Sequence, residues 1–299
     1  MTGIVKKIKE LKKKRNAVIL VHNYQLPEIQ DIADYRGDSL GLSREAAKTE
    51  ADVIVFCGVH FMAETAAILS PDKIVLLPDK DAGCPMANMI DAAQLRELKK
   101  KHPSAAVVCY VNSTAAVKAE SDCCCTSANA VDILRRIEKD EIIFVPDKYL
   151  GSFAAKRAGK KAVLYDGYCP VHMKILEQHI VNARKEHPRA KVLVHPECRT
   201  EVCEVADEVL STSGMEKYAR ESGHSEMIIG TETGLISRLR KDNPLKKFYP
   251  AFEGAVCPNM KKTSLEKVLW ALEEMQYRIE VKSEIAEAAR LAISRMVEG

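Results

Sequence analysis

AVILVHNY at residues 17–24, AVVCYVNS at 106–113 and KVLVHPEC at 191–198 are the stretches of sequence that decide the fold. Each is a short apolar run that ends in polar residues, which is typical of a buried strand. Aligning them gives two polar columns, one of His22, Tyr110 and His195 and one of Tyr24, Asn112 and Glu197. The chain therefore contains a threefold internal repeat.

Further positions recur at matched spacing after the first column. Each copy has an aspartate twelve residues on and a hydroxyl seventeen residues on, the hydroxyls being Ser39, Ser127 and Thr212. A second apolar run follows, and each copy closes on a Cys-Pro pair, at Cys84, Cys169 and Cys257. The separations between these cysteines match the period of the repeat, so the three cysteines are equivalent positions.

Helical patterns lie between the apolar runs and predict the fold class. Alternation of strand and helix with short connections favours parallel sheets that are covered on both faces. We expect an α/β protein of three homologous αβα units about a pseudo-threefold axis, with the active site at their central junction. The units are predicted at residues 1–86, 87–172 and 173–262. The helical segment 263–299 has no repeat equivalent after it, and we expect it to pack on the first unit.

The polar columns lie at the carboxyl ends of predicted strands, where ligands collect in parallel sheets. If the three units direct these ends at one axis, the cysteines converge on one cavity. Three thiolates cannot complete the four-cysteine coordination of an electron-transfer [4Fe–4S] cluster, so one iron stays open as a Lewis acid. We predict such a cluster on Cys84, Cys169 and Cys257. Zinc held by three cysteines and water is the competing interpretation, which spacing alone leaves open.

The three hydroxyls each precede a helical pattern. Helix N-termini present free N–H groups and the positive end of the dipole, so three that converge can hold phosphate and carboxylate groups. The competing interpretation makes each hydroxyl a simple N-cap. Their shared spacing favours anion binding by Ser39, Ser127 and Thr212.

The polar columns also supply groups for proton transfer to a small polar substrate. Glu197, beside His195 on one strand exit, is the candidate general base, and Tyr24 is the candidate proton shuttle during enolisation. His172, three residues after Cys169, is expected to enter the cavity or to orient a ligand, with a role at the start of a helix as the alternative. The remaining candidates are His22, Tyr110 and Asn112.

The other seven cysteines have no column of their own. Cys123, Cys124 and Cys125 are adjacent on an extended run and point alternately to opposite faces, so they cannot all bind one metal. We interpret them as packing thiols. Cys57, Cys109, Cys198 and Cys203 are interpreted as buried structural cysteines.

Charge and hydropathy exclude several function classes. The 45 basic and 42 acidic residues leave a net charge of +3, too weak to indicate a nucleic-acid or membrane partner. The apolar run at residues 17–21 is far shorter than the ~20 residues that a membrane span needs, and no signal-peptide pattern follows the N-terminal lysines. We expect a cytoplasmic protein.

Together these residues resemble the quinolinate synthase family. The resemblance rests on motifs that run nearly end to end, in the order HNYQ, GDS, GVHFMAET, AGCPMA, YVNST, CCTSANA, PDKYLG, GYCPVH, HPEC, STSGM, TETG and CPNM. It implies an enzyme of NAD biosynthesis with a [4Fe–4S] cluster on Cys84, Cys169 and Cys257. Its substrates would be iminoaspartate and dihydroxyacetone phosphate, and its products quinolinate, phosphate and water.

The resemblance also implies residue roles and a functional coupling to an enzyme that makes iminoaspartate. His22, Ser39, Ser127 and Thr212 would bind the carboxylate or phosphate groups of the substrates. Isomerisation of the triose phosphate, imine formation and dehydration would be handled by Tyr24, Tyr110, Asn112, His195 and Glu197.

One departure and two alternatives qualify the resemblance. Some members carry a CxxCxxC run ending in the third ligand, whereas this chain has Ala251 and Gly254 there, so a local redox-switch disulfide is not expected. The first alternative is a diphthamide-type radical enzyme, which would need a pocket for a methionine moiety. The second is a non-catalytic iron–sulfur sensor, in which the acid–base residues would have no use.

Overall fold

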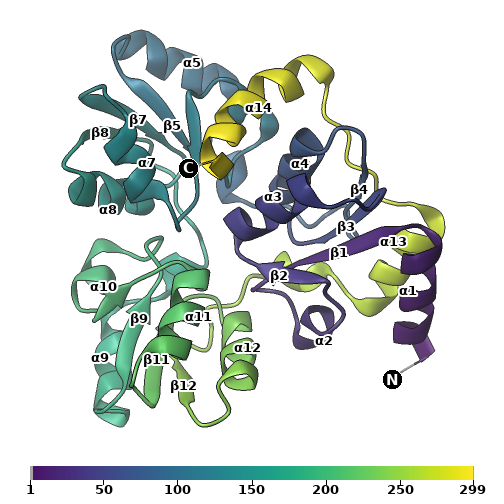
Figure 1. The fold of residues 1–299 in the computed structure, drawn as a ribbon. Helices are drawn as coiled ribbons and strands as arrows, with labels where there is room; N and C mark the ends of the chain where they lie inside the picture. The colour runs from purple at the N-terminus through teal and green to yellow at the C-terminus, as the bar shows by residue number, and fades with distance from the viewer. Residues whose placement is uncertain (1–2, 299) are drawn as a thin grey trace.

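The chain folds into three αβα units around a common centre, as the computed structural model of residues 3–298 shows (Figure 1). Each unit contains one four-stranded sheet, and every strand pair is parallel. The strand orders are β2-β1-β3-β4, β6-β5-β7-β8 and β10-β9-β11-β12, which is one topology repeated three times. The predicted fold class is therefore confirmed.

The first sheet is built from the N-terminal part of the chain. Its elements are α1 (Gly3–Lys14), β1 (Ala17–His22), α2 (Pro27–Gln30), β2 (Tyr35–Gly37), α3 (Ser39–Lys48), β3 (Val53–Cys57), α4 (His60–Leu69), β4 (Ile74–Leu76) and the 3-10 helix η1 (Met86–Asn88).

The second unit repeats this order. Its elements are α5 (Ala92–Lys101), β5 (Ala106–Tyr110), α6 (Ala115–Ala119), β6 (Cys123–Cys125), α7 (Ala130–Arg136), β7 (Glu141–Val145), α8 (Lys148–Ala158), β8 (Lys161–Leu164) and η2 (His172–Lys174).

The third unit repeats it again, and two further helices follow. The elements are α9 (Glu177–Glu186), β9 (Lys191–Val194), α10 (Thr200–Glu204), β10 (Glu208–Val209), α11 (Thr212–Glu221), β11 (Glu226–Gly230), α12 (Gly234–Asp242), β12 (Lys247–Pro250), η3 (Met260–Lys262), α13 (Leu265–Glu274) and α14 (Ser283–Glu298).

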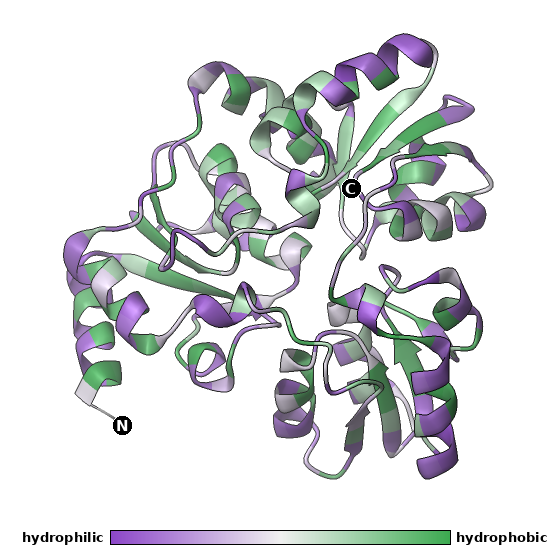
Figure 2. Cartoon of the chain, turned by 180° about the vertical axis from the view of Figure 1, so that it is seen from behind, coloured by the Kyte–Doolittle hydropathy of each residue, from purple (hydrophilic) through white to green (hydrophobic). Residues whose placement is uncertain are grey.

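The first strand of each unit is buried on both faces, because helices cover both sides of a parallel sheet. In β1, Val18 and Leu20 pack with α3 and α4, whereas Ile19 and Val21 pack with α1 and α13. Figure 2 shows the same arrangement, with apolar strands inside and polar residues on the outer helices. This two-sided burial explains why the strands appear in the sequence as continuous apolar runs.

The repeated aspartates have one structural role in all three units. The side chains of Asp34, Asp122 and Asp207 accept the backbone N–H groups of Ile19, Val107 and Val192 at 2.8, 2.7 and 2.7 Å. Each aspartate lies just before the short second strand of its unit. Its hydrogen bond holds this segment against the beginning of the first strand. The three copies are therefore equivalent in their hydrogen bonds as well as in sequence.

The C-terminal segment packs differently from the expectation. Helix α13 lies on α1 and β3 of the first unit, but α14 also packs on α6 and β6 of the second unit. The side chains Ala289, Ile293 and Met296 enter a core shared by both units, and Asn129 donates to the Met296 carbonyl at 3.1 Å. The apolar face of α14 thus fills the seam between two units rather than covering the first unit alone.

The seven cysteines without a repeat column all lie in or against the hydrophobic cores. Strand β6 consists of Cys123, Cys124 and Cys125, all of which are buried. Cys57, Cys109 and Cys198 are also buried, Cys203 packs against a core, and all ten cysteines are free thiols. No helix within residues 3–298 has the length and apolarity to cross a membrane.

Candidate active site at the junction of the three units

A cavity of about 210 Å³ lies where the three units meet. We call it the junction cavity. All thirteen site residues singled out from the sequence line it. Because the carboxyl ends of the first strands face it, residues that are far apart in the sequence come together at one place.

The three Cys-Pro pairs occupy equivalent positions around the junction cavity. Each precedes one of the 3-10 helices, η1, η2 or η3. Backbone N–H groups two and three residues further on hydrogen-bond to the sulfur of Cys84, Cys169 and Cys257. Each cysteine is therefore held by the same local turn.

Burial raises the pKa of the Cys84 thiol to about 12, and it also raises the pKa values of Cys169 and Cys257. The backbone N–H groups lower each pKa by less than burial raises it. At neutral pH the sulfurs are thus neutral thiols unless a metal cation shares the cavity with them. Three thiols from three units, each with amide donors, are a donor set that fits an iron–sulfur cluster with one open coordination site.

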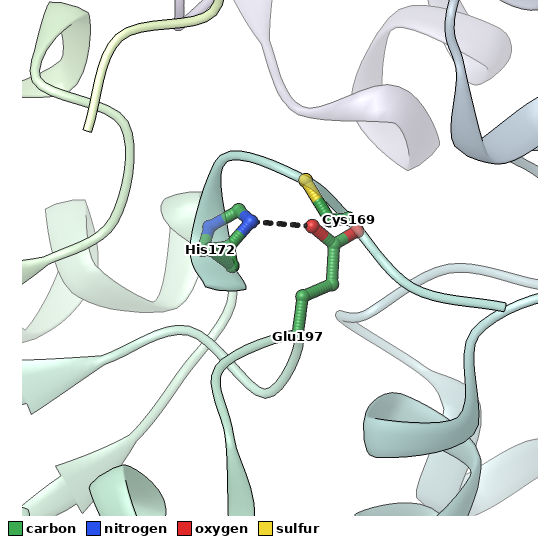
Figure 3. A group of neighbouring side chains, drawn as sticks. All are labelled: Cys169, His172 and Glu197. Carbon is green, nitrogen blue, oxygen red and sulfur yellow. Dashed lines mark ion pairs between the residues drawn. The ribbon is translucent and has the colours of Figure 1, made fainter. Parts of the chain in front are cut away.

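A second group of candidate metal ligands overlaps this set. The ligand atoms of Cys169, His172 and Glu197 lie within 4.8 Å of one another (Figure 3). His172 Nδ1 and Glu197 Oε2 are 2.7 Å apart, so these two side chains are in direct polar contact. This contact does not involve the sulfur of Cys169, which can therefore act as a metal ligand together with Cys84 and Cys257.

Glu197 is the hub of the polar groups in the junction cavity. Its carboxylate accepts a hydrogen bond of 2.5 Å from the Tyr110 hydroxyl and lies 3.5 Å from Asn112 Nδ2. Burial acts to raise the pKa of Glu197, but the neighbouring imidazoles of His172 and His195 and the Tyr110 hydrogen bond outweigh it and lower that pKa to about 2. Glu197 is therefore a carboxylate at neutral pH, although it is only 3% exposed.

A chain of hydrogen bonds runs from Glu197 to Tyr24 in the first unit. The Nδ1 atom of His172 contacts Glu197, and its Nε2 atom lies 2.9 Å from Thr231 Oγ1. Thr231 Oγ1 in turn lies 2.6 Å from the Tyr24 hydroxyl. Burial raises the pKa of Tyr24 well above its usual value, so the phenol keeps its proton. His172 thus enters the cavity region and orients other groups, while Thr231, at the end of β11, is a linking residue that the repeat columns did not reveal.

His22 and His195 share one local geometry in the first and third units. In each, Nδ1 accepts a backbone N–H from two residues on, that of Tyr24 at 3.1 Å and that of Glu197 at 3.3 Å. This bond assigns the proton to Nε2, and His195 Nε2 lies 3.1 Å from Ser127 Oγ. Burial lowers the pKa of both imidazoles to about 3, so both are neutral hydrogen-bonding groups at pH 7.

The repeated hydroxyls are not the helix caps. Helix α3 is capped by Asp38, whose carboxylate accepts the Gly41 N–H at 2.9 Å, so Ser39 is the first helical residue. Likewise Ser211 caps α11, and Thr212 follows it. The third hydroxyl, Ser127, precedes α7 by three residues. Ser39 and Thr212 therefore have no capping role and line the junction cavity, where the Thr212 hydroxyl accepts a hydrogen bond of 3.1 Å from Asn23 Nδ2.

Comparison with known proteins assigns the family. The family model described as quinolinate synthetase A protein matches residues 6–298. The chain belongs to the quinolinate synthase family. A quinolinate synthase of Dehalococcoides mccartyi strain CBDB1 is 60% identical over 97% of this chain and 96% of its own. Quinolinate synthases of Methanosarcina barkeri and Thermodesulfovibrio yellowstonii are each 55% identical over 98% of this chain and 97% of their own.

Membership of the quinolinate synthase family makes the chain an enzyme of NAD biosynthesis. Matches of this extent favour that activity over both the radical-enzyme and the sensor alternatives, because they span all three units rather than the cysteines alone. The polar network around Glu197 and Tyr24 agrees with this choice, since a sensor has no use for acid–base groups that meet at one cavity.

Proposed function

We propose that the chain condenses iminoaspartate with dihydroxyacetone phosphate to form quinolinate, releasing phosphate and water. The observation that carries this proposal is the meeting of three equivalent cysteines with acid–base and anion-binding groups at the junction cavity. Dehydration and condensation of a phosphorylated triose with a dicarboxylate require all three kinds of group in one place.

Cys84, Cys169 and Cys257 would hold a [4Fe–4S] cluster. When bound, the cluster supplies a Lewis acid that polarises a substrate carboxylate, carbonyl or hydroxyl group. Zinc in the same place remains the competing metal, and the donor set favours the cluster because all the protein ligands are thiols from separate units.

The chain's own residues would carry the proton transfers. Tyr24 is a neutral phenol at the end of the chain that joins Thr231, His172 and Glu197, so it is suited to give a proton to a leaving hydroxyl. Glu197 is a carboxylate and is suited to take a proton through His172 or directly from a substrate carbon. His22, Asn112, Tyr110 and His195 would orient the substrates by neutral hydrogen bonds.

Replacement of Thr231 by valine tests this chain of proton transfers. The variant keeps the shape of the side chain but removes the hydroxyl between Tyr24 and His172. We expect kcat to fall about 10- to 100-fold, at the lower end of general acid–base contributions, with KM within about twofold. Thr233→Val makes the same chemical change two residues on and should leave kcat unaltered. Equal kcat values for the two variants would remove Thr231 from the mechanism.

Replacement of Ser39 by alanine tests anion binding at the N-terminus of α3. A hydrogen bond to a charged group is worth ~1.5–3 kcal/mol, so we expect KM for dihydroxyacetone phosphate or for iminoaspartate to rise about tenfold or more. The change in kcat should be small. Ser43→Ala is the matched control, because the Ser43 hydroxyl donates only to the Ser39 carbonyl, at 2.7 Å. If Ser43→Ala raised KM by the same factor, the effect would come from a disturbed helix α3 and not from a lost contact with the substrate.

The proposed reaction is tested by product stoichiometry. The reconstituted protein is incubated without oxygen with iminoaspartate generated in place and dihydroxyacetone phosphate, and quinolinate and inorganic phosphate are both measured. We expect equal amounts of the two products, and neither product when one substrate is omitted. Phosphate release without quinolinate would contradict the proposed condensation.

A further inference from the structure

Glu232 is a buried carboxylate that none of the roles above uses. It lies two residues after the end of β11, is 0% exposed and lines the junction cavity. Its Oε1 accepts the backbone N–H of Cys257 at 3.0 Å, and its Oε2 accepts the backbone N–H of Gly234 at 2.7 Å. Glu232 therefore holds the backbone of the third candidate cluster ligand in place.

Lys261 links this carboxylate to the first unit. Its Nζ lies 2.9 Å from Glu232 Oε1 and also donates to the backbone carbonyl of Tyr24. Within this ion pair, Glu232 thus contacts the backbone of Cys257, and Lys261 contacts the backbone of Tyr24. A buried ion pair of this kind fixes its geometry strongly, because loss of one partner leaves an uncompensated charge.

Gly234 shows how closely these groups are packed. A Cβ added at Gly234 would lie 2.7 Å from Lys261 Nζ, 2.8 Å from Glu232 Oε2 and 2.8 Å from the Tyr24 carbonyl oxygen. The carbonyl is backbone and cannot move away cheaply. Only a residue without a side chain fits where these three groups meet.

The repeat shows that this arrangement is specific to the third unit. Asp147 occupies the position of Glu232 in the second unit, but its carboxyl group accepts the N–H groups of Tyr149 and Leu150, at 2.9 and 2.8 Å. Within residues 3–298 Asp147 has no ion-pair partner, and burial raises its pKa well above the usual value. The first unit has Val59 at this position, because Cys57, Val145 and Gly230 pair with equivalent residues of the first strands. Glu232 is thus the carboxylate of this column that is joined to another unit, through Lys261.

We propose that Glu232 and Lys261 are positioning residues that couple Cys257 to Tyr24. The pair sets the backbone of a cluster ligand and that of the proton donor relative to each other, so that the loop holding the metal and the loop holding the acid move together. The inference rests on the proposed function for the roles of Cys257 and Tyr24, but the coupling itself is a property of the chain and is measurable without substrate.

Hydrogen exchange on the metal-free protein measures the coupling directly. Lys261→Met keeps the length of the side chain but removes its charge. We expect amides in residues 22–26 of the first unit and in residues 255–260 of the third unit both to exchange at least tenfold faster. Peptides around Cys84 and Cys169 should be unchanged. Faster exchange in only one of the two segments would overturn the proposal.

Lys262→Met is the matched control, since Lys262 adjoins Lys261 in η3 but donates to the Asp81 carbonyl instead. It should exchange like the wild type in both segments; equal acceleration by the two variants would contradict the coupling. If Lys261→Met does not accumulate as a folded protein, Glu232→Gln keeps the shape of the carboxylate without its charge and should accelerate the same two segments. Lys261→Arg retains the charge and should restore slow exchange.

Gly234→Ala connects the coupling to the reaction. We expect kcat to fall at least tenfold and iron bound per chain to fall, with KM within about twofold. If Gly234 has a purely structural role, the variant will melt at a lower temperature but will have normal kcat and iron content at temperatures where it is folded. That result would overturn the proposal. Failure of the wild type to make quinolinate would instead contradict the proposed function and leave the exchange result as it is.

Discussion

Replacing Cys169 with alanine is expected to remove both the bound iron and the formation of quinolinate. Cys169 supplies one of three equivalent sulfurs, each held by the same 3-10 turn, and two thiolates leave a cluster without its third protein ligand. Lewis-acid stabilisation is worth several kcal/mol, and each 1.36 kcal/mol is a factor of ten in rate. The activity should therefore fall at least roughly a thousandfold.

Iron and sulfide content and turnover after anaerobic reconstitution measure this effect. Cys84→Ala and Cys257→Ala should behave like Cys169→Ala, because the repeat makes the three positions equivalent. Cys124→Ala is the control: Cys124 is buried in β6, in the core of the second unit, and should keep both cluster and activity. Normal iron content in any of the three ligand variants would contradict the assignment.

Glu197→Gln has the second large expected effect. The amide keeps the shape of the side chain but cannot take up a proton, and it disturbs the contacts with Tyr110 and with His172. General acid–base catalysis contributes ~10²–10⁴-fold, and a buried network left partly unsatisfied adds to the loss. We expect kcat to fall about a thousandfold, with iron content unchanged.

Glu201→Gln is the matched control for Glu197→Gln. Glu201 is an exposed residue on the neighbouring helix α10, and the same change in charge there should leave kcat within about twofold. Melting temperatures of both variants show whether the fold is kept. Turnover of a folded Glu197→Gln protein close to that of the wild type would exclude Glu197 as the general base.

The repeat made most of the fold and much of the site accessible from the sequence. The aspartate column corresponds to one hydrogen bond made three times, and the Cys-Pro column to one 3-10 turn made three times. Such positions can be found because the same physical requirement selects the same residue type in every copy. The parallel sheets follow from apolar runs that must be buried on both faces.

What the sequence did not reveal are residues whose roles differ between copies. The position of Glu232 is occupied by Asp147 and Val59 in the other units, and that of Thr231 by Pro146 and Gly58, so no column marks either residue. Lys261 acts through the reach of a long side chain across a unit boundary, which spacing does not show. The same limit applies to α14, whose apolar face is evident but whose partner depends on how two units pack.

The competing interpretation of the repeated hydroxyls as N-caps does not hold for Ser39 and Thr212, because the residue before each is the cap. Asp38 and Ser211 each accept an N-terminal N–H of α3 and α11, so the adjacent hydroxyls of Ser39 and Thr212 are not caps, and that of Thr212 accepts from Asn23 instead. Two neighbouring residues that are both good caps cannot be ranked from sequence alone. The geometry strengthens the proposal that these hydroxyls bind a substrate anion.

The proposed enzyme makes quinolinate with an iron–sulfur cluster on three cysteines and an acid–base network at the same cavity. It is tested most directly by measuring quinolinate formed from iminoaspartate and dihydroxyacetone phosphate by the wild-type chain, once reconstituted with iron and sulfide and once loaded with zinc. We expect sustained turnover by the iron–sulfur form and none by the zinc form. An intact cluster without quinolinate, or equal turnover with zinc, would contradict it.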